Sequence, residues 1–133
     1  MKTLCTAALV LLAWLAPPSA AAPTTLLVSF EQTGGFAGIE RGMAVTRTGK
    51  VVSNGHPVTV SQLSATRLAT LRDRLVAARW ATLRPKYEPE TPVADGYVYR
   101  ITYAGRTIRI DEGAILPLRL RRPYVMLRAI AGL

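Results

Sequence analysis

An alternating pattern of apolar and polar positions runs through residues 26–45 and predicts two β-strands. A period of two residues is typical of strands that bury one face of a sheet. A turn at Arg47–Lys50 that contains a glycine then leads into a third strand at Val51 and Val52. The apolar positions that carry the pattern of the first two strands are Leu26, Val28, Phe30, Ile39, Met43 and Val45.

The period changes after Ser64, where apolar residues begin to recur every three or four positions. This spacing places them on one stripe of an amphipathic helix, which we expect to run to about Arg79. Ser64 is the expected N-cap, because a serine hydroxyl can accept a hydrogen bond from a free amide of the first turn. The stripe consists of Leu68, Leu71, Leu75 and Ala78.

The second half of the chain predicts a loop, a hairpin and a short helix. Three prolines interrupt residues 80–93, so we expect this stretch to connect elements rather than to form one. Tyr97–Tyr103 alternates again, Ala104-Gly105 makes a two-residue turn, and Thr107–Asp111 returns as the partner strand. A short closing helix follows, in which Pro123 is expected only within the first turn. The expected apolar positions of that helix are Leu120, Tyr124, Leu127 and Ala131.

This order of strands, helix, hairpin and helix indicates an α+β fold in one small domain. We expect an antiparallel sheet with one longer helix and a short C-terminal helix, both packed on one face of the sheet. Tyr97, Tyr99 and Tyr103 share one face of the hairpin. At strand spacing such a row belongs to the apolar face of a sheet more often than to a binding platform.

The first 21 residues have the pattern of a secretory signal peptide rather than of a structural element. Lys2 precedes an apolar run from Leu4 to Leu15, which is too short for a transmembrane helix and ends in small residues. Cleavage is expected just before Ala22, so that residues 22–133 form the exported domain. We therefore expect a secreted protein with no membrane association once the signal is removed.

Composition narrows the class of partner. The chain carries a formal net charge of +9, mostly from arginine, which favours acidic partners or polyanions such as cell-wall polymers. Its one cysteine, Cys5, lies within the expected signal, so the exported domain must be stable without disulfides. Nucleic acid is not an expected partner, because no aromatic interleaving or helix-turn-helix pattern accompanies the charge. The arginines that form either a polyanion-binding patch or only a solvated face are Arg119, Arg121, Arg122 and Arg128.

Few residues are suited to catalysis. The one histidine, His56, lies in the turn sequence Asn-Gly-His-Pro and has no second imidazole to pair with. The exported domain has no thiol, and no serine stands in a Gly-x-Ser-x-Gly elbow. Asp111 and Glu112 are adjacent in sequence, so their side chains diverge and an acid–base pair needs a third residue from elsewhere. We therefore expect no enzymatic activity, no metal site and no cofactor.

A glycine-rich stretch between the first two strands is the most distinctive local feature. Gly34, Gly35 and Gly38 surround one large apolar side chain, Phe36, which is followed by Ala37. Glycine permits positive φ and close backbone approach, but it loses more entropy on ordering than any other residue. Such a loop is either a tight connection with Phe36 folded back into the core, or an element that inserts into a partner. The residues alone leave both possibilities open.

The stretch Phe30–Ile39 resembles the opening motif of the emfourin-like family, which are small protein inhibitors of thermolysin-type metalloproteases. The resemblance continues in a helix opened by Leu63-Ser64, in the hairpin, and in Asp111-Glu112-Gly113 before a final helix that contains a proline. It therefore covers essentially the whole expected exported domain. Its specificity rests on the Gly-Gly-Phe-Ala-Gly core.

We expect a monomer whose partner, as the resemblance implies, is a thermolysin-type zinc metalloprotease. Such proteases favour a large apolar side chain beside the scissile bond, which makes Phe36 the implied anchor. A backbone carbonyl or a carboxylate would then approach the zinc of the protease. The implied protease-binding residues are Gly34, Gly35, Phe36, Ala37, Gly38, Asp111 and Glu112. The alternative is a non-enzymatic basic module that binds anionic cell-wall polymer or another exported protein.

Overall fold

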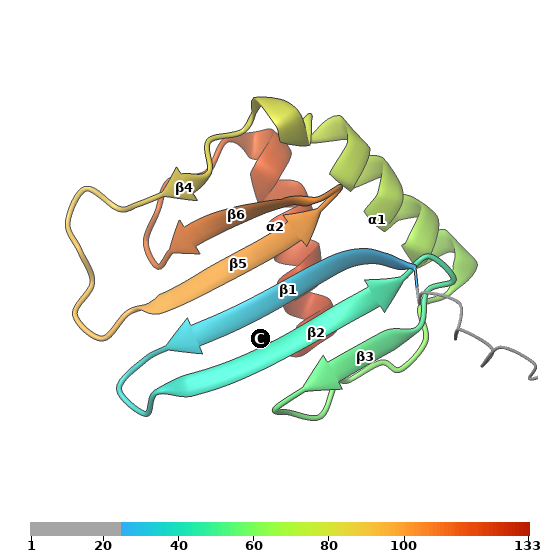
Figure 1. Cartoon of the computed structure of the whole chain (residues 1–133), viewed down its shortest axis with the longest axis horizontal. Helices are drawn as coiled ribbons and strands as arrows, with labels where there is room; N and C mark the ends of the chain where they lie inside the picture. The colour runs from blue at the N-terminus through green and yellow to red at the C-terminus, as the bar shows by residue number, and fades with distance from the viewer. Residues whose placement is uncertain (1–24) are drawn as a thin grey trace, which may run out of the picture.

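The computed structural model describes residues 25–133, and the expected signal peptide lies outside them. These residues form one six-stranded sheet with two helices on the same face (Figure 1). The strands are β1 (Leu26–Gly34), β2 (Ile39–Thr46), β3 (Val51–Asn54), β4 (Lys86–Tyr87), β5 (Tyr97–Tyr103) and β6 (Arg106–Asp111). The helices are α1 (Ala65–Ala77) and α2 (Leu118–Ala131), and a 3-10 turn, η1, covers Trp80–Thr82. The predicted α+β fold is confirmed.

The strands follow the order β3-β2-β1-β5-β6-β4 across the sheet, which places β1 near the centre. Every neighbouring pair is antiparallel except β4 with β6. Phe30 of β1 lies opposite Met43 on one side and Ile101 on the other. All three side chains are buried under the helices, whereas Glu31 lies on the uncovered face and is exposed. The period of two in the sequence is thus the alternation between a covered and an uncovered face.

The first helix forms as its pattern predicts. The Ser64 hydroxyl accepts a hydrogen bond from the amide of Arg67 at 3.2 Å, which caps the first turn. Leu71, Leu75 and Ala78 are completely buried, and Leu68 is nearly so. The burial of this stripe fixes α1 against the sheet.

The C-terminal helix differs from its prediction at Pro123. This residue is the sixth of α2 rather than a residue of the first turn, and α2 is 14 residues long against 13 for α1. A proline at this position removes the amide that would bond the carbonyl of Arg119, which normally weakens a helix. Here Pro123 is fully buried, as are Leu120 and Leu127 three residues before and four residues after it on the same helix face. Burial of the apolar ring is favourable and opposes the cost of the missing bond.

The expectation that residues 80–93 only connect elements is wrong for part of the stretch. After η1, residues Lys86 and Tyr87 form β4, which pairs in parallel with β6. Pro85 does not prevent this pairing, because it contributes its carbonyl, which accepts a hydrogen bond from the amide of Arg109 at 2.9 Å. The Tyr87 side chain is buried, and its burial holds this short strand at the edge of the sheet.

An aromatic cluster connects α2 to the middle of the sheet. The ring of Phe30 stacks on that of Tyr99 with 5.9 Å between centroids, and Tyr124 of α2 meets Tyr99 edge-on at 5.4 Å. Burial, followed by the proximity of Tyr99, raises the pKa of Tyr124 to about 12, although Arg128 acts in the opposite direction.

Neither of the helices within residues 25–133 is long and apolar enough to cross a bilayer.

We expect the protein to lose stability through Tyr124 as the pH rises above about 10. The unfolded chain releases the phenolic proton near pH ~10, whereas the folded protein holds it until about 12. Between these values the folded state binds more protons than the unfolded state, so the free energy of unfolding falls with rising pH. Urea denaturation across this range will show a smaller fall for Tyr124→Phe than for the parent protein. Equal falls in the two proteins would contradict the assignment.

Candidate functional site

Three chain segments meet at one end of the sheet (left in Figure 1). They are the β1–β2 turn, the loop of residues 88–96 before β5, and the residues that follow β6. The amide of Gly35 donates to the carbonyl of Gly96 at 3.4 Å, and the amide of Glu112 donates to the carbonyl of Tyr97 at 2.8 Å. These bonds join the three segments, which we call the loop end of the molecule.

The β1–β2 turn has a backbone that favours glycine. Gly34, Gly35 and Gly38 have φ values of 99°, 75° and 59°, a region that L-residues rarely adopt. A Cβ atom on Gly34 would lie 2.7 Å from the carbonyl oxygen of Gly96, and one on Gly35 would lie 2.5 Å from the ring of Tyr97. The first two glycines therefore allow the turn to rest directly on the start of β5.

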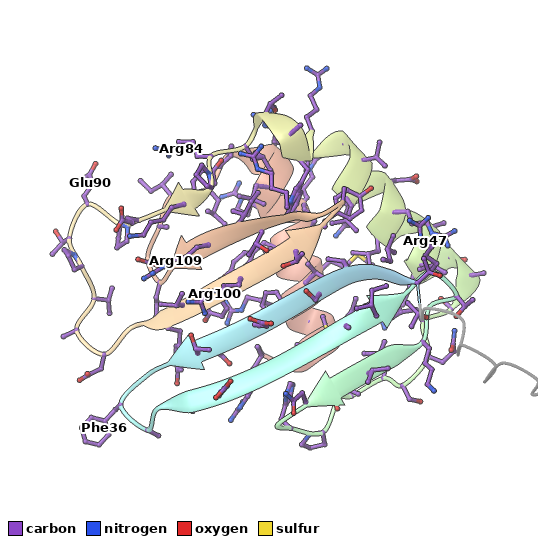
Figure 2. All side chains as sticks on the ribbon, viewed as in Figure 1. Phe36, Arg47, Arg84, Glu90, Arg100 and Arg109 are labelled. Carbon is purple, nitrogen blue, oxygen red and sulfur yellow. The ribbon has the colours of Figure 1, made fainter. Side chains whose placement is uncertain are left out.

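Phe36 lies at the tip of this turn and points away from the rest of the protein (Figure 2). Its side chain is 96% exposed, and the neighbouring Ala37 and Gly38 are exposed as well. Of the two possibilities that the sequence left open, the one in which Phe36 folds back into the core is excluded. Burying a side chain of this kind gains roughly 1.5–3 kcal/mol, so the turn presents an unused apolar contact.

The carboxylates predicted to take part, Asp111 and Glu112, lie at the same loop end but already have partners. Asp111 forms an ion pair with Arg109, in which Nε and Oδ1 are 2.6 Å apart, and this hydrogen bond raises the pKa of Arg109. One carboxylate oxygen of Glu112 accepts the amide hydrogen of Tyr97 at 2.8 Å. The Glu112 side chain therefore joins the residues after β6 to the start of β5, whereas the Asp111 side chain pairs within its own strand.

An open hollow of about 430 Å³ lies beside these carboxylates. The loop of residues 88–96 forms one wall of it, and this loop was not among the expected site residues. The dipeptide Asp95-Gly96 is a turn signal that could have indicated it, and Asp95 does adopt a positive φ of 53°. The side chains around the hollow include Glu88, Pro89, Glu90, Val93, Arg109, Asp111 and Glu112.

The predicted arginine patch is only partly assembled. Arg119, Arg121 and Arg122 lie in the first two turns of α2, where Arg74 of α1 joins them. Arg128 is separate, because its guanidinium lies 5.4 Å from the centre of the Tyr99 ring, between α2 and the sheet.

The features that could support catalysis or metal binding are sparse in the part of the chain that the structure describes. No group of three or more histidine, cysteine, aspartate or glutamate residues gathers there in a way that could hold a metal ion. His56 has a structural contact instead, since its Nε2 lies 2.9 Å from the carbonyl oxygen of Ala131 at the end of α2. The exposed β1–β2 turn is therefore a better candidate for a functional site than any catalytic or metal-binding group among these residues.

Comparison with protein-family models, with curated proteins and with solved structures found no significant match to this chain.

Two matched glycine substitutions test whether the turn rests on β5 as described. Gly34→Ala introduces backbone strain and a clash with the carbonyl of Gly96, whereas Gly38→Ala introduces the strain alone, because nothing lies within 4 Å of its Cβ position. We expect Gly38→Ala to cost about 1 kcal/mol of stability and Gly34→Ala to cost clearly more. The free energies of unfolding in urea measure both. Equal losses would mean that the turn does not rest on Gly96.

Proposed function

We propose that this protein is a secreted, non-enzymatic inhibitor of a thermolysin-like zinc metalloprotease. In this proposal the Gly34–Gly38 turn enters the active-site cleft and Phe36 occupies the apolar subsite beside the scissile-bond position. The observation that carries the proposal is the nearly complete exposure of Phe36 on a turn that the loop end supports. The resemblance of this turn to the emfourin-like motif supplies the class of target.

Preorganisation is the physical argument in favour of inhibition. An inhibitory loop pays less ordering entropy on binding when its shape is already fixed in the free protein. Here β1 and β2 pair up to Gly34 and Ile39, and the amide of Gly38 donates to the carbonyl of Gly35 at 3.0 Å within the turn. These bonds favour one conformation of the turn, so less of the binding energy is lost to ordering it.

The tip of the turn also offers backbone groups to the zinc of a protease. The carbonyl groups of Phe36 and Ala37 accept no hydrogen bond from residues 25–133. A carbonyl oxygen at this tip is a better candidate for the zinc-facing group than Asp111 or Glu112, whose carboxylates already have partners. In the proposed complex Glu112 supports the turn indirectly, because it holds Tyr97, which lies opposite Gly34. Gly34 and Gly35 let it rest on β5.

The substitution Phe36→Ala tests the anchor directly. Removing a central aromatic anchor typically costs about 2 kcal/mol or more of binding free energy, so we expect the inhibition constant to rise roughly thirtyfold or more. Stability should stay unchanged, because the side chain makes almost no contact in the free protein. Titration of a thermolysin-type metalloprotease with each protein measures the effect.

Val76→Ala is the matched control for this experiment. Val76 is also an exposed apolar residue, with 67% of its surface accessible, but it lies on α1 rather than on the turn. We expect this variant to inhibit as well as the parent. If Phe36→Ala also inhibits as well as the parent, Phe36 is not the anchor.

A further inference from the structure

A groove separates the two helices on the side of the molecule away from the uncovered sheet face. It begins as a hollow of about 530 Å³ between the end of α1 and the start of α2, and it continues into a second hollow that shares Arg74 and Arg122. We call the two hollows together the helix groove. Its lining residues are Asp73, Arg74, Ala77, Pro117, Leu118, Arg119, Arg121, Arg122 and Val125.

The charged side chains that line the helix groove are mostly positive. Four arginines line it, with Asp73 as the one carboxylate among the lining residues. Within residues 25–133 the ion pairs are Lys86 with Glu88 and Arg109 with Asp111, so no arginine of the groove is neutralised by a partner in the fold. The groove therefore has positive charge available for an anionic ligand.

The position of these arginines on α2 is unfavourable for the helix itself. Arg119, Arg121 and Arg122 lie near the positive end of the helix dipole, where a cation costs up to about 1 kcal/mol. Pro117 at the N-cap position provides no side-chain cap, and the first turn contains no acidic residue that would compensate. A bound anion would relieve this repulsion, so charge complementarity favours a partner that brings carboxylates.

The apolar part of the helix groove narrows the choice of partner further. Leu118 and Val125 are 54% and 55% exposed, and Ala77 and Pro117 add apolar surface to the same lining. A hydrophilic anionic polymer would leave this surface without a contact. An amphipathic segment would cover it and still bring its acidic groups to the arginines, as in the docking of helices into apolar grooves.

We propose that the helix groove binds an acidic, amphipathic segment of a partner protein. Aliphatic side chains of the segment contact Leu118 and Val125, and its carboxylates pair with Arg119, Arg121 and Arg122. The β1–β2 turn lies at the loop end, apart from the two helices (Figure 1). The residues that line the groove belong to these helices and to Pro117 at the start of α2. This proposal therefore does not rest on protease inhibition.

The test uses a fluorescein-labelled synthetic peptide with leucines on one helical face and glutamates on the other. Fluorescence anisotropy at low salt will show binding to the purified protein, and a peptide with lysine in place of glutamate will not bind. A peptide with serine in place of leucine keeps the charge but loses the apolar face, so we expect it to bind at least tenfold more weakly. Equal binding of the serine and leucine peptides would overturn the amphipathic assignment.

The variant Arg119→Ala/Arg122→Ala tests the location of the site. We expect it to bind the peptide at least tenfold more weakly and to remain folded, because removing cations from the start of α2 does not weaken that helix. The charge-matched control is Arg47→Ala/Arg67→Ala, which changes two exposed arginines outside the groove and should bind like the parent. Figure 2 shows Arg47 at the end of the sheet opposite Phe36.

Two results would contradict the proposal. One is equal weakening in the groove variant and in the control, which would mean that peptide binding reflects net charge alone. The other is displacement of the peptide by a polyphosphate chain that binds the groove more tightly, which would make the site one for anionic polymer. Protease inhibition by the groove variant is a separate readout and should equal that of the parent.

Discussion

The packing of Phe30 between the sheet and α2 is the constraint on which the rest of the structure depends. Phe30 is 1% exposed, and its ring stacks on that of Tyr99 in β5. The centroids of the Phe30 and Tyr124 rings are 6.3 Å apart, which brings α2 into the same cluster. Removing such a ring from a core typically costs about 3–5 kcal/mol, against a total stability of roughly 5–15 kcal/mol for a small domain. This contact joins three elements that lie far apart in the sequence.

The same contact sets the register of β1 and, through it, the position of the turn. A slip of one residue would turn every side chain of the strand to the opposite face. With Phe30 inside, Gln32 is also inside, and Gly34 reaches the end of the strand where it faces Tyr97. Gly35 and Phe36 then extend beyond the sheet. Phe36 is exposed because it lies in the turn beyond Gly34 and Ile39, the last residues that pair β1 with β2.

Local patterns in the sequence predicted the elements that depend on neighbouring residues. The stripe of α1, its Ser64 cap and the hairpin around Ala104-Gly105 follow from spacing alone and are confirmed. The sequence did not predict features that depend on distant contacts. β4 exists because it pairs with β6, and Pro123 lies within α2 because the core accommodates its ring.

In the candidate site, too, the sequence predicted the features that depend on neighbouring residues but not those that depend on distant contacts. The glycines marked the turn, because their conformational freedom is a property of single residues. The exposure of Phe36 depends on where the pairing of β1 with β2 ends, and the support from Gly96 and Tyr97 depends on the pairing of β1 with β5. The separation of Arg128 from the other arginines has a similar cause, since only the packed helix shows which arginine faces the sheet.

The most direct test of the proposed function is titration of a thermolysin-type metalloprotease with residues 22–133, at low and at high salt. A rigid turn anchored by apolar burial predicts stoichiometric inhibition that changes little with salt, because screening weakens exposed charges and not apolar contacts. Absence of inhibition across several such proteases would contradict the proposal. Inhibition that disappears at high salt would contradict the role of Phe36 as its anchor.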